Sequence, residues 1–253
     1  MMTSSRSSQQ ADGPGLRNPL DPTRRIRAVL FDLDGTLYQQ PRMRALMAME
    51  LAISFATRPL SARRRLRALS AYRKAQESLR TSVGGDVSAK TQLELAADRA
   101  GVPAQEGDAL VTEWMFERPL KYLPSCRAEG LFELLSLLEQ TGLPLGVLSD
   151  YPADAKLRAL GVDGRFSVVL CSSDPEVGAL KPDPRGFLRA AERWQTDAAD
   201  VLVVGDRLEV DGYGAVAAGM PCVIIGKPAS ASISGVLFLP TLERLRCVLD
   251  AGR

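Results

Sequence analysis

The chain reads Ile26-Arg27-Ala28-Val29-Leu30-Phe31-Asp32-Leu33-Asp34-Gly35-Thr36 where an apolar run meets two aspartates. The apolar run predicts a buried strand, so Asp32 and Asp34 are expected at the mouth of a sheet. Gly35 lets the chain turn sharply there, and the Thr36 hydroxyl can brace the turn. A carboxylate in this position can attack a phosphorus atom while its neighbour moves the proton.

Three later segments also bring polar side chains to the ends of predicted strands. They are Ser149-Asp150, Lys181-Pro182-Asp183-Pro184 and Gly205-Asp206-Arg207-Leu208-Glu209-Val210-Asp211. Predicted strands alternate with predicted helices over residues 123–253, which indicates a doubly wound parallel sheet of the α/β class. Ligands of such sheets bind at the carboxyl ends of the strands, which is where all four segments fall.

A long helical segment separates the first predicted strand from the rest. Residues 41–122 show helical periodicity, with Ser88 as a candidate N-cap and Gly101 as the end of the helix that follows. The sequence therefore predicts an inserted all-α cap domain at 41–122 and a catalytic core at 25–40 and 123–253. Residues 1–24, rich in Ser, Gln, Gly, Pro and Arg, predict a disordered tail.

The composition limits the classes of partner. The net charge of the 253-residue chain is +2, so no nucleic acid partner is expected. Charge is concentrated in residues 42–80, where ten Arg and Lys face only Glu50 and Glu77. A solvated helix face explains this segment most simply. Anion recognition in the substrate, an acidic partner and an anionic membrane surface are the alternatives.

The histidine and cysteine content restricts the chemistry. The chain has no histidine, which excludes a histidine base, a histidine nucleophile and any His-containing metal site. Its four cysteines are far apart, so free thiols in a reducing compartment are expected. No segment has the length of a membrane span, and the N-terminus lacks the apolar region of a secretory signal. We expect a cytoplasmic protein; the sequence does not indicate its oligomeric state.

The four segments together predict a metal site. Asp32 and Asp34 at a buried strand end repel each other and lose solvation, so a cation is expected beside them. Oxygen ligands without histidine or clustered cysteine favour Mg²⁺. The hydroxyl of Ser149 can donate to a phosphoryl oxygen, or alternatively cap the helix that follows. The flanking prolines restrict where Lys181 points.

The four segments resemble the motifs of the haloacid dehalogenase superfamily of phosphohydrolases. Their order and spacing over residues 26 to about 225 are similar to the phosphoglycolate phosphatase-like branch with a helical cap. The resemblance implies a Rossmann-like core. It implies that Asp32 is the nucleophile, forming an aspartyl-phosphate, and that Asp34 protonates the leaving oxygen and then activates water.

The resemblance also implies the roles of the other site residues. Lys181 would screen Asp32 and the phosphoryl group, and Asp206 would bind Mg²⁺ directly. Asp32 and the backbone carbonyl of Asp34 would bind the same ion, while Asp211 is either a ligand or a partner of the ligands. Asp150 departs from the family pattern, which often has Asn or Gly after the serine; it could bind substrate hydroxyls or pair with a cation.

The function expected from these features is a Mg²⁺-dependent phosphatase acting on a small phosphorylated metabolite. A phosphomutase of the same superfamily, which returns the phosphate to a sugar, is the second hypothesis. A catalytically silent binding protein on this scaffold is the third. A dehalogenase is disfavoured because its chemistry does not need the second acid, Asp34. Substrate choice is expected to come from the cap.

Overall fold

The fold was analysed in a computed structural model that describes residues 19–20, 25–80, 87–228 and 233–251. The predicted tail falls outside the described residues except for Pro19 and Leu20, and Leu20 packs against the core. No helix of the described residues is long and apolar enough to cross a membrane. Cys126, Cys171, Cys222 and Cys247 are free thiols.

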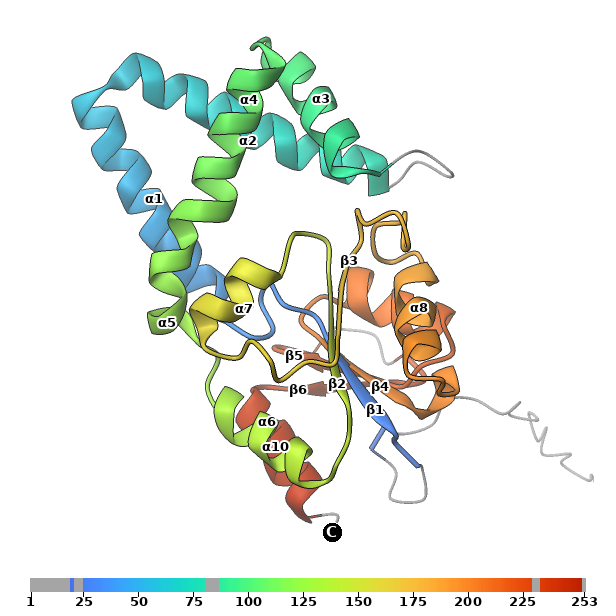
Figure 1. The fold of residues 1–253 in the computed structure, drawn as a ribbon. Helices are drawn as coiled ribbons and strands as arrows, with labels where there is room; N and C mark the ends of the chain where they lie inside the picture. Colours follow the sequence, from blue (N-terminus) through green and yellow to red (C-terminus); the bar gives the residue numbers. More distant parts are fainter. Residues whose placement is uncertain (1–18, 21–24, 81–86, 229–232, 252–253) are drawn as a thin grey trace, which may run out of the picture.

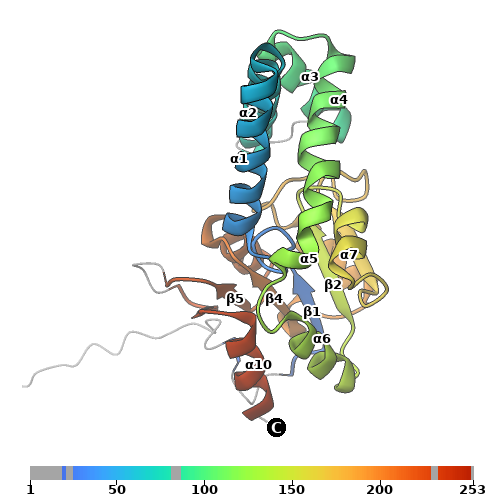
Figure 2. The ribbon, with the colours of Figure 1, turned by 90° about the vertical axis from the view of Figure 1, so that its left-hand side faces the viewer.

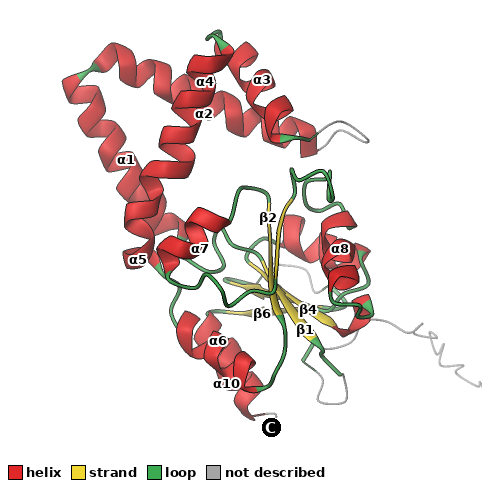
Figure 3. Cartoon of the chain, in the orientation of Figure 1, coloured by secondary structure: helices red, strands yellow, loops and turns green. Residues whose placement is uncertain are grey.

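A parallel sheet of six strands forms the centre of the molecule, as predicted (Figure 3). The strand order is β3-β2-β1-β4-β5-β6, and every neighbouring pair is parallel. The strands are β1 (Ala28–Phe31), β2 (Leu145–Ser149), β3 (Val168–Cys171), β4 (Val201–Gly205), β5 (Cys222–Ile225) and β6 (Val236–Leu239). The chain reverses direction across the sheet between β1 and β4, so the crevice at their carboxyl ends is the expected ligand site.

Helices cover both faces of the sheet because both faces of its strands are apolar. Val29 and Phe31 of β1 pack into one core cluster with α6 (Leu131–Gln140), α7 (Asp154–Leu160) and α10 (Leu242–Ala251). Ala28 and Leu30 pack on the opposite face. Their cluster includes residues of α8 (Arg185–Arg193) and α9 (Tyr213–Ala217). The two layers of helices are visible on either side of the strands in Figure 1.

Between β1 and α6 every described element is a helix, and most of these helices form a group beyond the sheet and its covering helices (Figures 1 and 2). They are α1 (Gln40–Thr57), α2 (Pro59–Arg80), α3 (Ala89–Ala100), α4 (Ala104–Val111), η1 (Thr112–Glu117), η2 (Arg118–Tyr122) and α5 (Leu123–Cys126). We call α1 to η2 the cap. The structure thus has the α/β core with an inserted all-α cap that was predicted from the sequence. The domain boundaries at residues 41 and 122 stay a prediction.

Capping residues and π-turns form the ends of several helices. Ser88 caps α3 by accepting the N–H of Thr91, and Gly101 ends it in the left-handed conformation, both as predicted. The wide π-turn η4 (Leu208–Gly212) directly precedes α9. A second π-turn, η1, extends α4 beyond Val111. Such turns depend on local tertiary contacts rather than on periodicity, and they are frequent at functional sites.

Candidate active site

The carboxylate of Asp32 lies at the carboxyl end of β1 and is only 8% exposed. Thr36 is completely buried and its hydroxyl donates to Asp32 Oδ2 at 3.0 Å, which confirms the bracing role predicted for it. The Nζ of Lys181 donates to Asp32 Oδ1 at 2.5 Å. Thr36, four residues along the chain, and Lys181, from a distant loop, thus fix the orientation of the Asp32 carboxylate.

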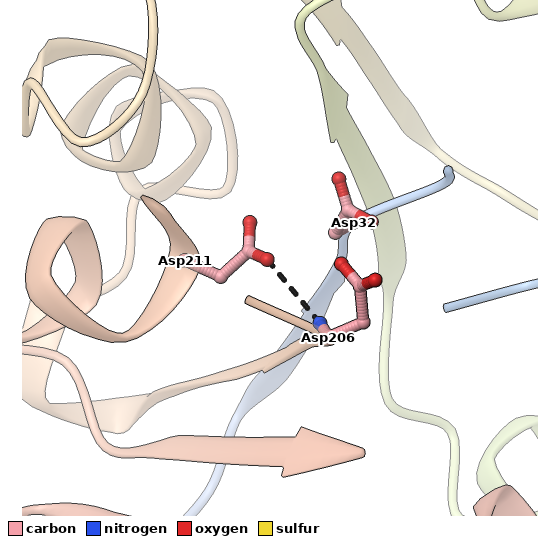
Figure 4. A group of neighbouring side chains, drawn as sticks. All are labelled: Asp32, Asp206 and Asp211. Carbon is pink, nitrogen blue, oxygen red and sulfur yellow. Dashed lines mark hydrogen bonds between the residues drawn. The ribbon is translucent and has the colours of Figure 1, made fainter. Parts of the chain in front are cut away.

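The carboxylates of Asp32, Asp206 and Asp211 converge at the carboxyl ends of β1 and β4 (Figure 4). Oxygen atoms of Asp32, Asp206 and Asp211 all lie within 4.8 Å of one another. They come from the ends of two adjacent parallel strands, because Asp206 follows β4 directly and Asp211 lies in η4. The structure therefore brings together three of the four predicted metal residues through their side chains. The Asp34 carboxylate is not part of this group, and metal binding through its backbone carbonyl stays a prediction.

Asp211 is held by protein groups on both oxygens. Its Oδ1 accepts Lys181 Nζ at 2.7 Å, and its Oδ2 accepts the N–H groups of Asp206 at 3.2 Å and Arg207 at 3.1 Å. This carboxylate folds the loop after β4 back on itself and aims Asp206. Of the two roles left open for Asp211, the geometry favours that of a partner that positions the ligands.

The pKa values of the cluster show an excess of negative charge. Burial raises the pKa of Asp32 well above its usual value; Lys181 opposes the rise, and Asp211 and Asp206 add to it. Burial, reinforced by Asp211, likewise raises the pKa of Asp206 to about 6. Carboxyl groups that are costly to ionise side by side are stabilised as anions by a cation.

A divalent cation fits this site. The donors are carboxylate oxygens from converging loops, which is the ligand chemistry of Mg²⁺. Lys181 supplies one positive charge against three carboxylates, and burial followed by the neighbouring carboxylates raises the pKa values of Asp32 and Asp206, which a bound cation would lower. Asp32 and Asp206 are the side chains that would hold the ion.

The second acid of the motif, Asp34, has its own pair of partners. Lys156 of α7 donates to both of its carboxylate oxygens, at 2.5 and 2.8 Å, and the hydroxyl of Tyr38 donates to Oδ1. Burial and the neighbouring Asp34 raise the pKa of Tyr38, so this hydroxyl stays a donor. Neither Lys156 nor Tyr38 was predicted as a site residue, because a single lysine in a short helix carries no local signal.

Ser149 is completely buried at the end of β2, where its Oγ accepts the N–H of Tyr151 at 3.1 Å. The hydroxyl proton is available to a second acceptor, so donation to a phosphoryl oxygen stays a prediction for Ser149. Because the bonded N–H belongs to the connecting loop and α7 begins at Asp154, Ser149 does not act as the N-cap of that helix.

Asp150, the residue that departs from the family pattern, pairs with a cation from the cap. Arg80 Nη2 at the end of α2 donates to Asp150 Oδ2 at 2.8 Å, and both side chains are 9% exposed. Asp150 Oδ1 accepts from Ser172 Oγ at 2.6 Å and from the N–H of Lys181 at 3.1 Å. Arg80 also donates to the carbonyl of Lys181. One ion pair therefore ties the cap to the backbone of the predicted catalytic lysine.

Tyr151 makes a second contact between the core and the cap. Its ring lies 6.4 Å from that of Tyr72 and 6.1 Å from that of Phe116, and all three belong to the apolar cluster of the cap. Its hydroxyl donates to Gln76 Oε1 at 2.5 Å. No role was predicted for Tyr151 from the sequence.

The basic segment of the cap divides into two parts. Arg64 forms an exposed pair with Glu106 at 3.6 Å, and the guanidinium of Arg65 stacks on the ring of Trp114 at 5.3 Å. Arg73 and Lys74 instead line a cavity of about 610 Å³ between the cap and Asp34. The solvated role predicted for this segment thus fits Arg64, and Arg65 packs within the cap. Arg73 and Lys74 instead face the cavity.

Gly35 is required by a close approach as well as by its backbone conformation. Its φ is +112°, and a Cβ added there would overlap Oδ2 of Asp206. Gly35→Ala is therefore expected to displace Asp206 and to weaken Mg²⁺ affinity by about tenfold or more. Gly142→Ala is the matched control, since Gly142 also has a positive φ, of +73°, but open space around it. Calorimetric titration with Mg²⁺ measures both; equal losses would contradict the steric argument.

Arg80→Leu is expected to destabilise the protein by about 3 kcal/mol, because it leaves the buried Asp150 carboxylate without its closest cation. Denaturant unfolding measures this, and adding Asp150→Asn should recover part of the loss. The exposed pair Lys90–Glu94, at 3.7 Å, is the control: Lys90→Leu should cost less than about 1 kcal/mol. An Arg80→Leu protein as stable as the wild type would show that the pair contributes nothing.

The comparisons agree with this geometry. The family described as haloacid dehalogenase-like hydrolase matches residues 26–219, and the chain belongs to this family. A phosphoglycolate phosphatase of Shigella boydii is 31% identical over an alignment of 221 positions that covers 78% of this chain and 80% of that protein. The N-acetylmuramic acid 6-phosphate phosphatase of Pseudomonas putida is 31% identical over an alignment of 195 positions that covers 73% of this chain and 76% of that protein.

Among solved structures, a 2-haloacid dehalogenase from Pseudomonas syringae superimposes with a TM-score of 0.64 and 26% identity. The match covers 90% of this chain and all of the other. Proteins similar to this chain are thus named for phosphatase activity and for dehalogenase activity.

Proposed function

We propose that the protein is a Mg²⁺-dependent phosphatase that hydrolyses a small phosphate monoester through an aspartyl-phosphate. The observation that carries this proposal is the buried Asp32 carboxylate, fixed by Thr36 and Lys181 beside two further carboxylates. Phosphatase-named relatives at 31% identity support the same reaction class.

In the first step an oxygen of Asp32 attacks phosphorus, the bond from phosphorus to the ester oxygen breaks, and Asp34 gives that oxygen its proton. In the second step Asp34 takes a proton from water, the water oxygen attacks phosphorus, and phosphate leaves Asp32 as the free carboxylate. Lys156 and Tyr38 hold Asp34 in place for both proton transfers.

Charge on the phosphoryl group is balanced by nearby cations. Lys181 already contacts Asp32, so its Nζ lies where an oxygen of the phosphoryl group would approach. A bound Mg²⁺ would neutralise the phosphoryl oxygens and the surrounding carboxylates. Asp32, Asp206 and the carbonyl of Asp34 are the proposed ligands, with Asp211 positioning the loop.

The deciding experiment is release of phosphate from p-nitrophenyl phosphate with and without Mg²⁺. A phosphatase releases phosphate continuously and only with the metal. A phosphomutase would release very little, and a binding protein none. Release of halide from a 2-haloacid, assayed in parallel, would assign the chain to the dehalogenases instead.

A further inference from the structure

The cavity beside Asp34 is far larger than a two-carbon substrate needs. Asp34, Tyr38 and Lys156 form its floor on the core side, and its volume is about 610 Å³. Pockets of about 300–1,000 Å³ bind ligands of drug size. In the proposed reaction the ester oxygen must reach Asp34, so the organic part of the substrate extends from there into the cavity.

The walls of the cavity are mainly apolar and come from the cap. Met43, Met47 and Leu51 of α1 face Leu66 and Leu69 of α2 across it. Such walls favour an apolar group, because contact with them removes its surface from water. Methionine side chains also adapt to irregular shapes. A sugar or a glycolate group would leave these surfaces without a matching partner.

The charged groups of the cavity leave a surplus of positive charge. Its two acids are both paired, Asp34 with Lys156 and Glu77 with Arg80. Arg44, Arg73 and Lys74 also line it, and within the described parts of the chain none of these three forms an ion pair. Because the phosphoryl group belongs at Asp32 and Lys181, these cations are available for a second anionic group.

We propose that the substrate is a phosphate monoester whose organic part is bulky and apolar and carries a second negative charge, such as a carboxylate. This inference rests on the proposed phosphatase function and names the substrate class of the same site. The apolar body would lie against α1 and α2, and the second anion would lie near Arg44, Arg73 and Lys74. Arg73 is placed for this role, since it lines the same cavity as Tyr151 and Asp34 of the core.

Four primary alkyl phosphates of similar leaving-group chemistry test the proposal: ethyl phosphate, 2-phosphoglycolate, 2-phenylethyl phosphate and 2-(4-carboxyphenyl)ethyl phosphate. With Mg²⁺ present, kcat/KM is expected to rise about tenfold from ethyl to phenylethyl, because the ring is buried. The added carboxylate should raise it about tenfold again through charge-assisted bonds. A preference for 2-phosphoglycolate over the carboxyphenylethyl ester would overturn the inference and leave the phosphatase function standing.

Two variants separate the contribution of the apolar wall from that of the positive charge. Ala48→Phe, on the cavity wall of α1, should lower the phenylethyl-to-ethyl ratio about tenfold. Arg73→Gln should lower the ratio between the carboxylated and uncarboxylated phenylethyl esters by a similar factor. Arg63→Gln is the matched control, because Arg63 is exposed on the same helix and does not line the cavity. A control that shifts either ratio as strongly would show that net charge, not the cavity, determines the preference.

Calorimetric titration with the corresponding non-hydrolysable phosphonates separates this inference from the proposed function. The carboxyphenylethyl phosphonate should bind about a hundredfold more tightly than the ethyl phosphonate. Equal affinities would overturn the inference even if every ester is hydrolysed. The expected order of affinities without hydrolysis of any ester would uphold the preference of the cavity and refute the phosphatase.

Discussion

Asp32→Asn is expected to lower kcat by at least about a thousandfold, because an amide cannot attack phosphorus and the Asp34 carboxylate is held away by Lys156 and Tyr38. The protein should remain folded, since Lys181 keeps its bond to Asp211. Quenching the wild-type reaction with borohydride should reduce the aspartyl-phosphate to homoserine, which mass spectrometry would locate at position 32.

Asp163→Asn is the control for this experiment, because it makes the same chemical change at an exposed position. It should leave both turnover and the reduction product unaltered. Homoserine at any other aspartate would overturn the assignment of the nucleophile, and full turnover of Asp32→Asn would refute covalent catalysis by this residue.

The second large effect concerns the metal. Asp206→Ala is expected to abolish Mg²⁺ binding in calorimetry and to lower kcat at least about a hundredfold, because it removes a carboxylate of the three-acid cluster. Excess chelator should inactivate the wild type to the same extent. Glu209→Ala is the matched control, since Glu209 lies in the same loop but is exposed. Full activity in chelator would refute the metal mechanism.

The sequence predicted the parts of the site that depend on strand ends. Asp32, Lys181 and the loop from Asp206 to Asp211 are far apart in the chain. Asp32 and Asp206 directly follow β1 and β4, and parallel strands bring such positions to one edge. Lys181 was predicted at a strand end but lies in a loop well beyond the end of β3, and this loop carries it to Asp32. Thr36 could be predicted for a similar reason, since its contact with Asp32 spans only four residues.

The contacts that the sequence did not predict all depend on packing between separate units. Lys156 contacts Asp34 because α7 packs against the face of the sheet that carries Val29 and Phe31. No local sequence pattern predicts this contact. Arg80 was one of ten basic residues in its segment. The available signal was Asp150, because an acid buried beside a phosphate site requires a cation, but the sequence could not identify which one.

The contacts between Arg80 and the core affect how the cap can move away from the site. Moving α2 away would hydrate the Arg80–Asp150 pair, remove a donor from the carbonyl of Lys181 and separate the rings of Tyr72 and Tyr151, all at once. Contacts that break together favour two distinct states over a continuous range of cap positions. The enzyme would then admit substrate and release product in discrete openings, whose frequency depends on residues that never touch the phosphate.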